Sequence, residues 1–142
     1  MKRKILVTGG LGYIGSHTVV ELINNGFEVV IIDDLSNSYE SVIDNIEKIA
    51  GLRPKFYEFD LKNPVKTNQC FKDNKFDGII HFAAHKSVEE SVSMPLKYYR
   101  NNVGTMLNVV DSMLTCGLKN IIFSSSCTVY GQPDVLPVSE EA

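Results

Sequence analysis

Glycine residues follow the first apolar segment of the chain at a spacing that suits a pyrophosphate. The stretch KILVTGGLGYIGSH contains Gly10-x-Gly12-x-x-Gly15 and, starting one residue earlier, Gly9-x-x-Gly12-x-x-Gly15. Between a strand and a helix, such glycines allow a tight turn, a close approach of the backbone to phosphate, and close packing of helix on strand. The N-terminus of the following helix then offers free N–H groups and a partial positive charge to the phosphates. The loop therefore predicts a dinucleotide site.

Asp33 is the candidate that decides which dinucleotide would fit. It ends the second apolar segment and follows Gly15 by 18 residues, close to the roughly 20 expected for an acid that accepts hydrogen bonds from the adenosine ribose hydroxyls. A carboxylate at this place would repel a 2′-phosphate, so the spacing favours NAD over NADP as the cofactor. The alternative, an ordinary acidic turn after a strand, loses weight because the glycine loop precedes Asp33 in the right context.

Further polar side chains follow the later apolar segments. Asp60 comes after the third segment, and Lys86 comes shortly after the fourth, where a lysine can reach a cofactor hydroxyl or phosphate or be merely solvated. His81 ends the fourth segment and is expected to be buried. His85 is expected to be exposed, and because nothing beside it forms a metal-ligand set, no metal site is predicted. Three serines, 124–126, follow the fifth segment, either as an ordinary strand end or as the edge of an active site.

Strands and helices must alternate to bring these residues together. Five nearly continuous apolar runs are typical of strands covered on both faces, and segments with helical spacing and end signals lie between them. The alternation, with right-handed crossovers, predicts an α/β fold, a Rossmann-like doubly wound parallel sheet with helices on both faces. The predicted strands are Lys4–Val7, Glu28–Ile32, Lys55–Phe59, Gly78–Phe82 and Asn120–Phe123, and the predicted helices are 14–23, Tyr39–Ala50, Pro64–Asp73 and Pro95–Cys116.

Composition narrows the class of protein and its partners. The 142 residues are 44% hydrophobic and 22% charged, the balance of one globular domain. A net charge of −3 without a basic block argues against nucleic acid or an anionic lipid surface as partner. Apolar runs of about five residues are far too short to span a membrane. The basic N-terminus lacks a secretory apolar stretch, and the three cysteines have no zinc or disulfide spacing, so a reducing cytoplasmic location is expected.

Several of these segments together resemble the extended short-chain dehydrogenase/reductase family, from Lys4 to about Val138. Within that family, GYIGSHT, DLSNS, PLKYYRNN and FSSSCTVYG are most similar to enzymes that invert C4 of a UDP-linked hexose. The glycine loop is common to the family, whereas the serine block discriminates among its reactions. The segments that carry the resemblance are Thr8-Gly9-x-x-Gly12-x-x-Gly15, Asp33, His81-Phe82-Ala83-Ala84, Tyr98-Tyr99-x-Asn101-Asn102 and Phe123-Ser124-Ser125-Ser126-x-Thr128-Val129-Tyr130-Gly131.

The resemblance implies a role for each matching residue in an NAD site. The first group would surround the pyrophosphate, the second would hold the adenosine ribose and a phosphate, the third would flank the adenine, and the fourth would complete the site. Ser126 would be the catalytic serine that hydrogen-bonds the sugar 4-hydroxyl. The four groups are Gly9, Gly12, Tyr13, Ile14 and Gly15; Asp33, Asn37 and Ser38; Asp60 and Leu61; and Phe82, Ala83, Lys86, Asn101 and Ser124.

The chemistry implied by the resemblance is a transient oxidation, in which hydride is transferred to the cofactor and then returned. Tightly bound NAD would take hydride from C4 of the UDP-hexose and return it to the opposite face, which interconverts UDP-glucose and UDP-galactose in galactose metabolism. The cofactor carries the difficult step, and the protein orients the sugar and assists with proton transfer. The resemblance also implies a homodimer for the full-length protein.

The family pattern is incomplete in this chain. No tyrosine here has a lysine four residues later, so the Tyr-x-x-x-Lys pair implied by the resemblance is expected beyond Ala142. Residues 1–142 are therefore expected to be a partial NAD-binding domain, with the C-terminal strands and the substrate domain absent, and to be inactive alone. An uncovered edge at 121–123 would also make the isolated chain poorly soluble or molten. Two departures, His85 and Glu89, lie away from the expected hydride path.

Two other functional classes stay open on the sequence alone. One is another nucleotide-sugar enzyme of the same family, a 4,6-dehydratase, a decarboxylase or a uronate epimerase. The first two tend to place an acidic pair after the serine or threonine at this strand end, where Ser126-Cys127-Thr128 has none. The other is a non-catalytic dinucleotide-binding module, since a fold alone does not establish catalysis.

Overall fold

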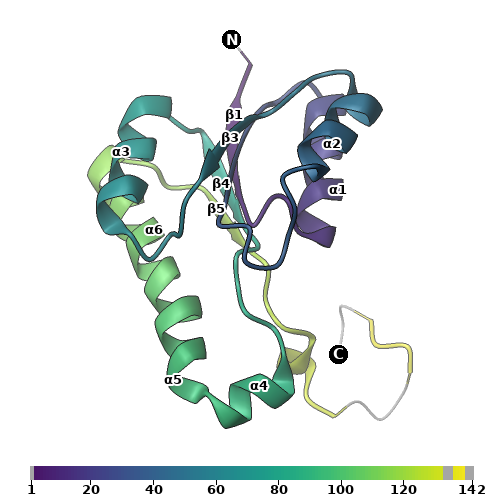
Figure 1. The fold of residues 1–142 in the computed structure, drawn as a ribbon, viewed down its shortest axis with the longest axis vertical. Coiled ribbons are helices and arrows are strands. Elements are labelled where there is room, and N and C mark those ends of the chain that lie inside the picture. Colours follow the sequence, from purple (N-terminus) through teal and green to yellow (C-terminus); the bar gives the residue numbers. More distant parts are fainter. Residues whose placement is uncertain (1, 133–135, 140–142) are drawn as a thin grey trace.

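Strands and helices alternate along the chain in the computed structural model (Figure 1), which describes residues 2–132 and 136–139. A π-helical segment η1 (Tyr99–Val103) and a 3₁₀ turn η2 (Cys127–Tyr130) accompany the regular elements. The strands are β1 (Lys4–Thr8), β2 (Glu28–Asp33), β3 (Lys55–Glu58), β4 (Gly78–His81) and β5 (Ile121–Phe123). The helices are α1 (Tyr13–Asn24), α2 (Val42–Ala50), α3 (Pro64–Asn74), α4 (Val88–Ser93), α5 (Pro95–Tyr98) and α6 (Gly104–Cys116).

The five strands form one parallel sheet in the order β3-β2-β1-β4-β5. The order confirms the doubly wound topology predicted from the sequence, in which the chain moves outward from β1 in both directions. β1 is central, and its Leu6 lies beside Val30 of β2 and Ile79 of β4. All five strands run the same way, so their carboxyl ends, and the loops that follow them, meet at one edge of the sheet.

Each face of the sheet has its own hydrophobic core. Neighbouring residues of a strand point to opposite faces, so Leu6 packs on the side of α3 and α6 while Val7 packs on the side of α1 and α2. Both side chains are fully buried, and each such burial contributes about 1.5–3 kcal/mol. Figure 1 shows the two helical layers on either side of the sheet. The prediction of helices on both faces is confirmed.

Local signals explain where most helices begin and end. α3 begins after Asn63, whose side-chain oxygen accepts a hydrogen bond from the Lys66 N–H, and Pro64 occupies its first turn. α6 ends at Gly117, which adopts a left-handed conformation. α2 begins at Val42, three residues later than predicted, because the preceding residues form only turn-like hydrogen bonds.

The segment between β4 and β5 differs most from the sequence-based prediction. The helix predicted over Pro95–Cys116 is present, but it consists of α5, the π-helical η1 and α6. The short helix α4 was not predicted. A π-helical turn holds one residue more than an α-turn and occurs frequently at functional sites.

The outermost strand β5 is poorly covered. Its residues Ile121, Ile122 and Phe123 are 37%, 63% and 55% exposed, as expected for an apolar strand at an open edge of the sheet. The effect of this edge on solubility stays a prediction. Within residues 2–132 and 136–139, no helix combines the length and apolar character needed to cross a membrane.

Candidate functional site

The glycine loop between β1 and α1 is too tightly packed to accept side chains. Gly9 has φ +66°, and a Cβ there would lie 2.8 Å from the Ala83 nitrogen. A Cβ at Gly15 would lie 2.2 Å from the Gly9 carbonyl oxygen. The same carbonyl accepts a hydrogen bond from the Gly12 N–H at 3.2 Å. The loop thus brings bare backbone against the segment after β4 and lets α1 start close to the sheet.

The N-terminus of α1 carries an uncompensated partial positive charge. Gly12 occupies the N-cap position without any side-chain hydrogen bond, and no acidic residue lies in the first turn. Tyr13 and Ile14 follow, and both are exposed. A helix N-terminus of this kind attracts anions such as phosphate. The glycine cradle and this helix end together fit the pyrophosphate of a dinucleotide.

Asp33 at the end of β2 joins three parts of this edge. One carboxylate oxygen accepts a hydrogen bond from the Leu11 N–H at 3.0 Å, and the other accepts from the Leu35 N–H at 3.1 Å and from the Ser38 hydroxyl at 2.8 Å. A carboxylate offers about four acceptor positions, so one is left for a ribose hydroxyl. Asp33 is 9% exposed. Its place is as predicted, while the internal bonds that link the glycine loop to the segment after β2 were not predicted.

The remaining residues assigned to the adenosine end lie nearby with different exposures. Asn37 is exposed, and Asp60 is partly exposed and forms an ion pair with Lys62 at 3.1 Å. The side chain of Leu61 is 4% exposed and belongs to the core beneath α3 and α6. Leu61 could therefore border an adenine only through its backbone. The roles of these residues stay predictions.

The segment after β4 lies against the glycine loop. The Phe82 N–H donates to the Thr8 carbonyl oxygen at 3.0 Å and extends the pairing of the two strands. Phe82 and Ala83 are half-buried, whereas the side chain of Lys86 is exposed. Phe82 and Ala83 are thus brought beside the glycine loop, whereas the side chain of Lys86 extends into solvent.

His81 is a buried structural residue, as the sequence predicted. Its side chain is 1% exposed, and its Nδ1 atom lies 2.7 Å from the Thr8 hydroxyl oxygen. Burial lowers the pKa of His81 to about 4, because the interior disfavours the charged imidazolium. A neutral, enclosed imidazole stacked on Phe123 supports the strand ends and is not placed to act as a base.

The π-helical segment η1 presents two asparagines to this region. Asn101 is 8% exposed, and its side-chain amide donates to the Asn102 side-chain oxygen at 3.1 Å. Asn102 pairs with the backbone of His85, accepting from its N–H at 2.9 Å and donating to its carbonyl oxygen at 3.0 Å. The sequence drew attention to the Asn-Asn pair but not to this contact. Asn102 therefore anchors the segment that carries Lys86.

The three serines extend from β5 at the same edge. The Ser124 N–H donates to the His81 carbonyl oxygen at 3.1 Å, which continues the strand pairing. Ser126 caps the turn η2, and its hydroxyl lies 2.8 Å from that of Thr128. All three serines are exposed. Ser124 thus lies beside the end of β4, and Ser126 presents its hydroxyl further out.

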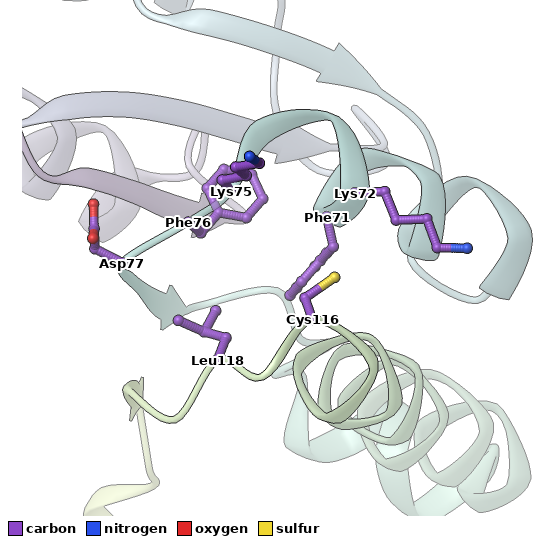
Figure 2. Close-up of a pocket in the computed structure, with 7 residues that line it drawn as sticks. All are labelled: Phe71, Lys72, Lys75, Phe76, Asp77, Cys116 and Leu118. Atoms are coloured by element: carbon purple, nitrogen blue, oxygen red, sulfur yellow. The ribbon is translucent and has the colours of Figure 1, made fainter.

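A cleft of about 530 Å³ lies at the opposite end of the sheet (Figure 2). It is bordered by the end of α3, the end of α6 and the segments that lead into β4 and β5, and so it lies at the amino ends of those strands. It does not belong to the candidate site. Its lining residues are Phe71, Lys72, Lys75, Phe76, Asp77, Cys116 and Leu118. The described residues contain no cluster of three or more histidine, cysteine or acidic side chains that could hold a metal ion.

Taken together, the strand order, the glycine cradle and the acid at the end of β2 define a protein of the Rossmann-type class. Comparison with known proteins narrows the class. A model of the NAD dependent epimerase/dehydratase family matches residues 5–142. The chain belongs to that family.

Bacterial UDP-glucose 4-epimerases are among the proteins similar to this chain. The chain is 47% identical over 137 residues to a UDP-glucose 4-epimerase of Bacillus subtilis (strain 168), covering 96% of this chain and 40% of the relative. It has the same identity over 137 residues to a UDP-glucose 4-epimerase of Klebsiella pneumoniae, covering 96% of this chain and 99% of that relative. The crystal structure of the Stenotrophomonas maltophila UDP-glucose-4-epimerase with bound NAD and formylated UDP-arabinopyranose superposes with a TM-score of 0.91 at 42% identity, covering 99% of this chain and 42% of that one. The chain thus spans about 40% of the length of the Bacillus relative.

Proposed function

We propose that this chain binds NAD and forms the cofactor half of an enzyme that interconverts UDP-glucose and UDP-galactose. The observation that carries the proposal is the meeting of the glycine cradle, Asp33, the segment after β4 and the serines at one edge of the sheet. The similarity to UDP-glucose 4-epimerases supports the choice of reaction. The full-length protein, meaning this chain together with the remainder that the longer relatives possess, would act in the cytoplasm as a homodimer.

The residues of the cradle would hold the cofactor. The backbone at Gly9 and Gly12 and the N-terminus of α1 would receive the pyrophosphate, and Asp33 would accept a hydrogen bond from a ribose hydroxyl through its remaining acceptor position. NAD, when bound, supplies the acceptor and donor of hydride for C4 of the hexose. Because burial keeps His81 neutral, this residue would add no positive charge at the carboxyl end of β4.

Ser126 would orient the sugar. Its hydroxyl is exposed and bonded only locally, to Thr128, so it can exchange that partner for the 4-hydroxyl of a hexose and hold it for proton transfer. A group that positions and relays a proton contributes about 10²-fold or more to rate. The base itself would come from the Tyr-x-x-x-Lys pair that the family resemblance implies and that this chain lacks.

The test is conversion of UDP-galactose to UDP-glucose by the full-length protein without net release of NADH. Ser126→Ala should lower kcat by about 10²-fold while NAD binding is unchanged. Ser125→Ala is the matched control, since Ser125 is an exposed neighbour with no proposed role, and it should keep activity. Equal loss in both variants would refute the role of Ser126. If UDP-galactose fails while a uronic acid or N-acetyl sugar reacts, the substrate assignment changes.

A further inference from the structure

Glu90, in the middle of the short helix α4, connects that helix to the next one. One of its carboxylate oxygens pairs with the Lys97 ammonium at 2.5 Å, and the other accepts a hydrogen bond from the Tyr98 hydroxyl at 2.8 Å. The hydrogen bond from Lys97, followed by that from Tyr98, lowers the pKa of the Glu90 carboxyl. Both partners lie on α5, so a single charged side chain bridges the break at Met94 between the two helices.

The contact pattern of Glu90 departs from what its sequence position suggests. Ser87-x-x-Glu90 is the pattern of a capping box, in which the serine accepts from the glutamate N–H and the glutamate side chain returns to the serine N–H. Here the first half is formed, because the Ser87 hydroxyl oxygen accepts from the Glu90 N–H at 3.3 Å. The carboxylate instead turns to Lys97 and Tyr98. Glu90 therefore links Ser87, the residue directly after Lys86, to α5: its backbone N–H bonds to Ser87, and its carboxylate bonds to α5.

His85, the residue before Lys86, is held by α5 and η1. The backbone of His85 is held on both its N–H and its carbonyl oxygen by Asn102, and the His85 ring packs on Tyr98 with centroids 5.6 Å apart. Lys86 itself is exposed. Its neighbours on both sides are thus fixed on α5 and η1, while its side chain alone extends outward. Fixing the flanking backbone reduces the conformational entropy that the lysine loses when it binds a ligand.

We infer that Glu90 is a positioning residue that acts through Lys86, holding the segment 85–87 so that the ammonium meets a hydroxyl or phosphate of the dinucleotide. The inference rests on the proposed NAD site. Tyr98 contributes to the same positioning, because its hydroxyl donates a hydrogen bond to one Glu90 carboxylate oxygen and its ring packs against His85.

A double-mutant cycle on the full-length protein tests the inference, with the dissociation constant of NAD measured by calorimetry after removal of bound cofactor. Lys86→Ala is expected to weaken NAD binding about tenfold, an effect of the size of one lost charge-assisted contact. Glu90→Ala is expected to weaken it severalfold, on the order of a partial loss of that contact. In the Lys86→Ala background, Glu90→Ala should add nothing.

Glu89→Ala is the matched control. Glu89 is an exposed acid on the same helix, and its removal changes the net charge by the same amount without touching Lys97 or Tyr98. It should leave NAD binding unchanged. Tyr98→Phe removes only one hydroxyl, alters no charge, and should reproduce part of the Glu90→Ala effect. If Glu90→Ala does not fold, Tyr98→Phe tests the positioning role of Glu90 in its place.

The outcomes separate the inference from the proposed function. If the wild-type protein binds NAD and Glu90→Ala weakens binding equally with and without Lys86, Glu90 is merely structural and the inference fails. It fails also if Glu90→Ala and Tyr98→Phe bind NAD as tightly as the wild type. If the wild type binds no NAD, the proposed function itself is wrong.

Discussion

Acidification should destabilise this fold through His81. The imidazole is enclosed at the end of β4 against Thr8 and Phe123, and its pKa falls from the ordinary 6.5 to about 4. The folded state therefore keeps His81 neutral in a range of pH where the unfolded chain binds a proton. The stability contributed by the neutral histidine is fully present above pH 6.5 and is lost progressively as the pH falls from there toward 4.

The size of the effect is set by proton linkage. Between pH 7.5 and pH 5 the unfolded state gains most of one proton at this site and the folded state almost none, which lowers the free energy of unfolding by about 2 kcal/mol. The limit below pH 4 is about 3 kcal/mol, set by the whole pKa difference. Other titrating groups add their own pH dependence, so the contribution of His81 must be isolated by comparison.

His81→Asn supplies that comparison, because asparagine keeps a polar atom near Thr8 and does not titrate. Urea denaturation of both full-length proteins should show a wild-type advantage at pH 7.5 that shrinks by about 2 kcal/mol at pH 5. NMR of protein labelled at histidine should show one resonance, absent from His81→Asn, that does not titrate above pH 5. If that resonance titrates near pH 6.5, or the two proteins lose stability in parallel, the burial argument is refuted.

The packing leads to three further predictions. Gly15→Ala should destabilise the protein by about 3 kcal/mol and abolish NAD binding, because its Cβ would overlap backbone. Gly104→Ala has open space around it and should raise the free energy of unfolding by about 1 kcal/mol. Urea denaturation measures both changes in stability. Ile122→Lys, at a 63% exposed position of β5, should increase the soluble yield of the isolated 142-residue chain, measured after centrifugation; an unchanged yield would contradict the role of the open edge. Cys70, whose burial raises its thiol pKa to about 11, should resist alkylation by iodoacetamide under conditions that modify the exposed Cys116, as read by peptide mass spectrometry.

Strands β1, β2 and β4 were predictable because they are largely buried on both faces. The run from Val29 to Ile32 is apolar at every position, a pattern typical of a strand covered on both faces. The ends predicted for all five strands agree with the observed strands to within one residue. Parallel pairing then places the residues after each strand at a single edge, so the meeting of the glycine loop, Asp33 and the serines could be expected from the sequence.

Contacts that depend on exact register could not be predicted. α4 is only six residues long and buries none of them, so it has no apolar stripe packed against a core. The capping-box pattern Ser87-x-x-Glu90 was the signal in the sequence that the prediction missed. The π-turn within 99–103 has no pattern of its own against a helical background. The internal hydrogen bonds of Asp33 depend on backbone N–H groups, such as that of Leu11, whose direction is fixed only once the loop is folded.

The π-helical turn also makes the length of this segment a fixed quantity. Removal of one residue from 99–103 would restore an ordinary α-helix and rotate α6 by about 100° relative to α5. Either Val109 and Met113 would leave the core that they share with α3, or Asn102 would leave the backbone of His85. After deletion of a single residue, the chain could keep either the packing of α6 or the anchoring of the segment that carries Lys86, but not both.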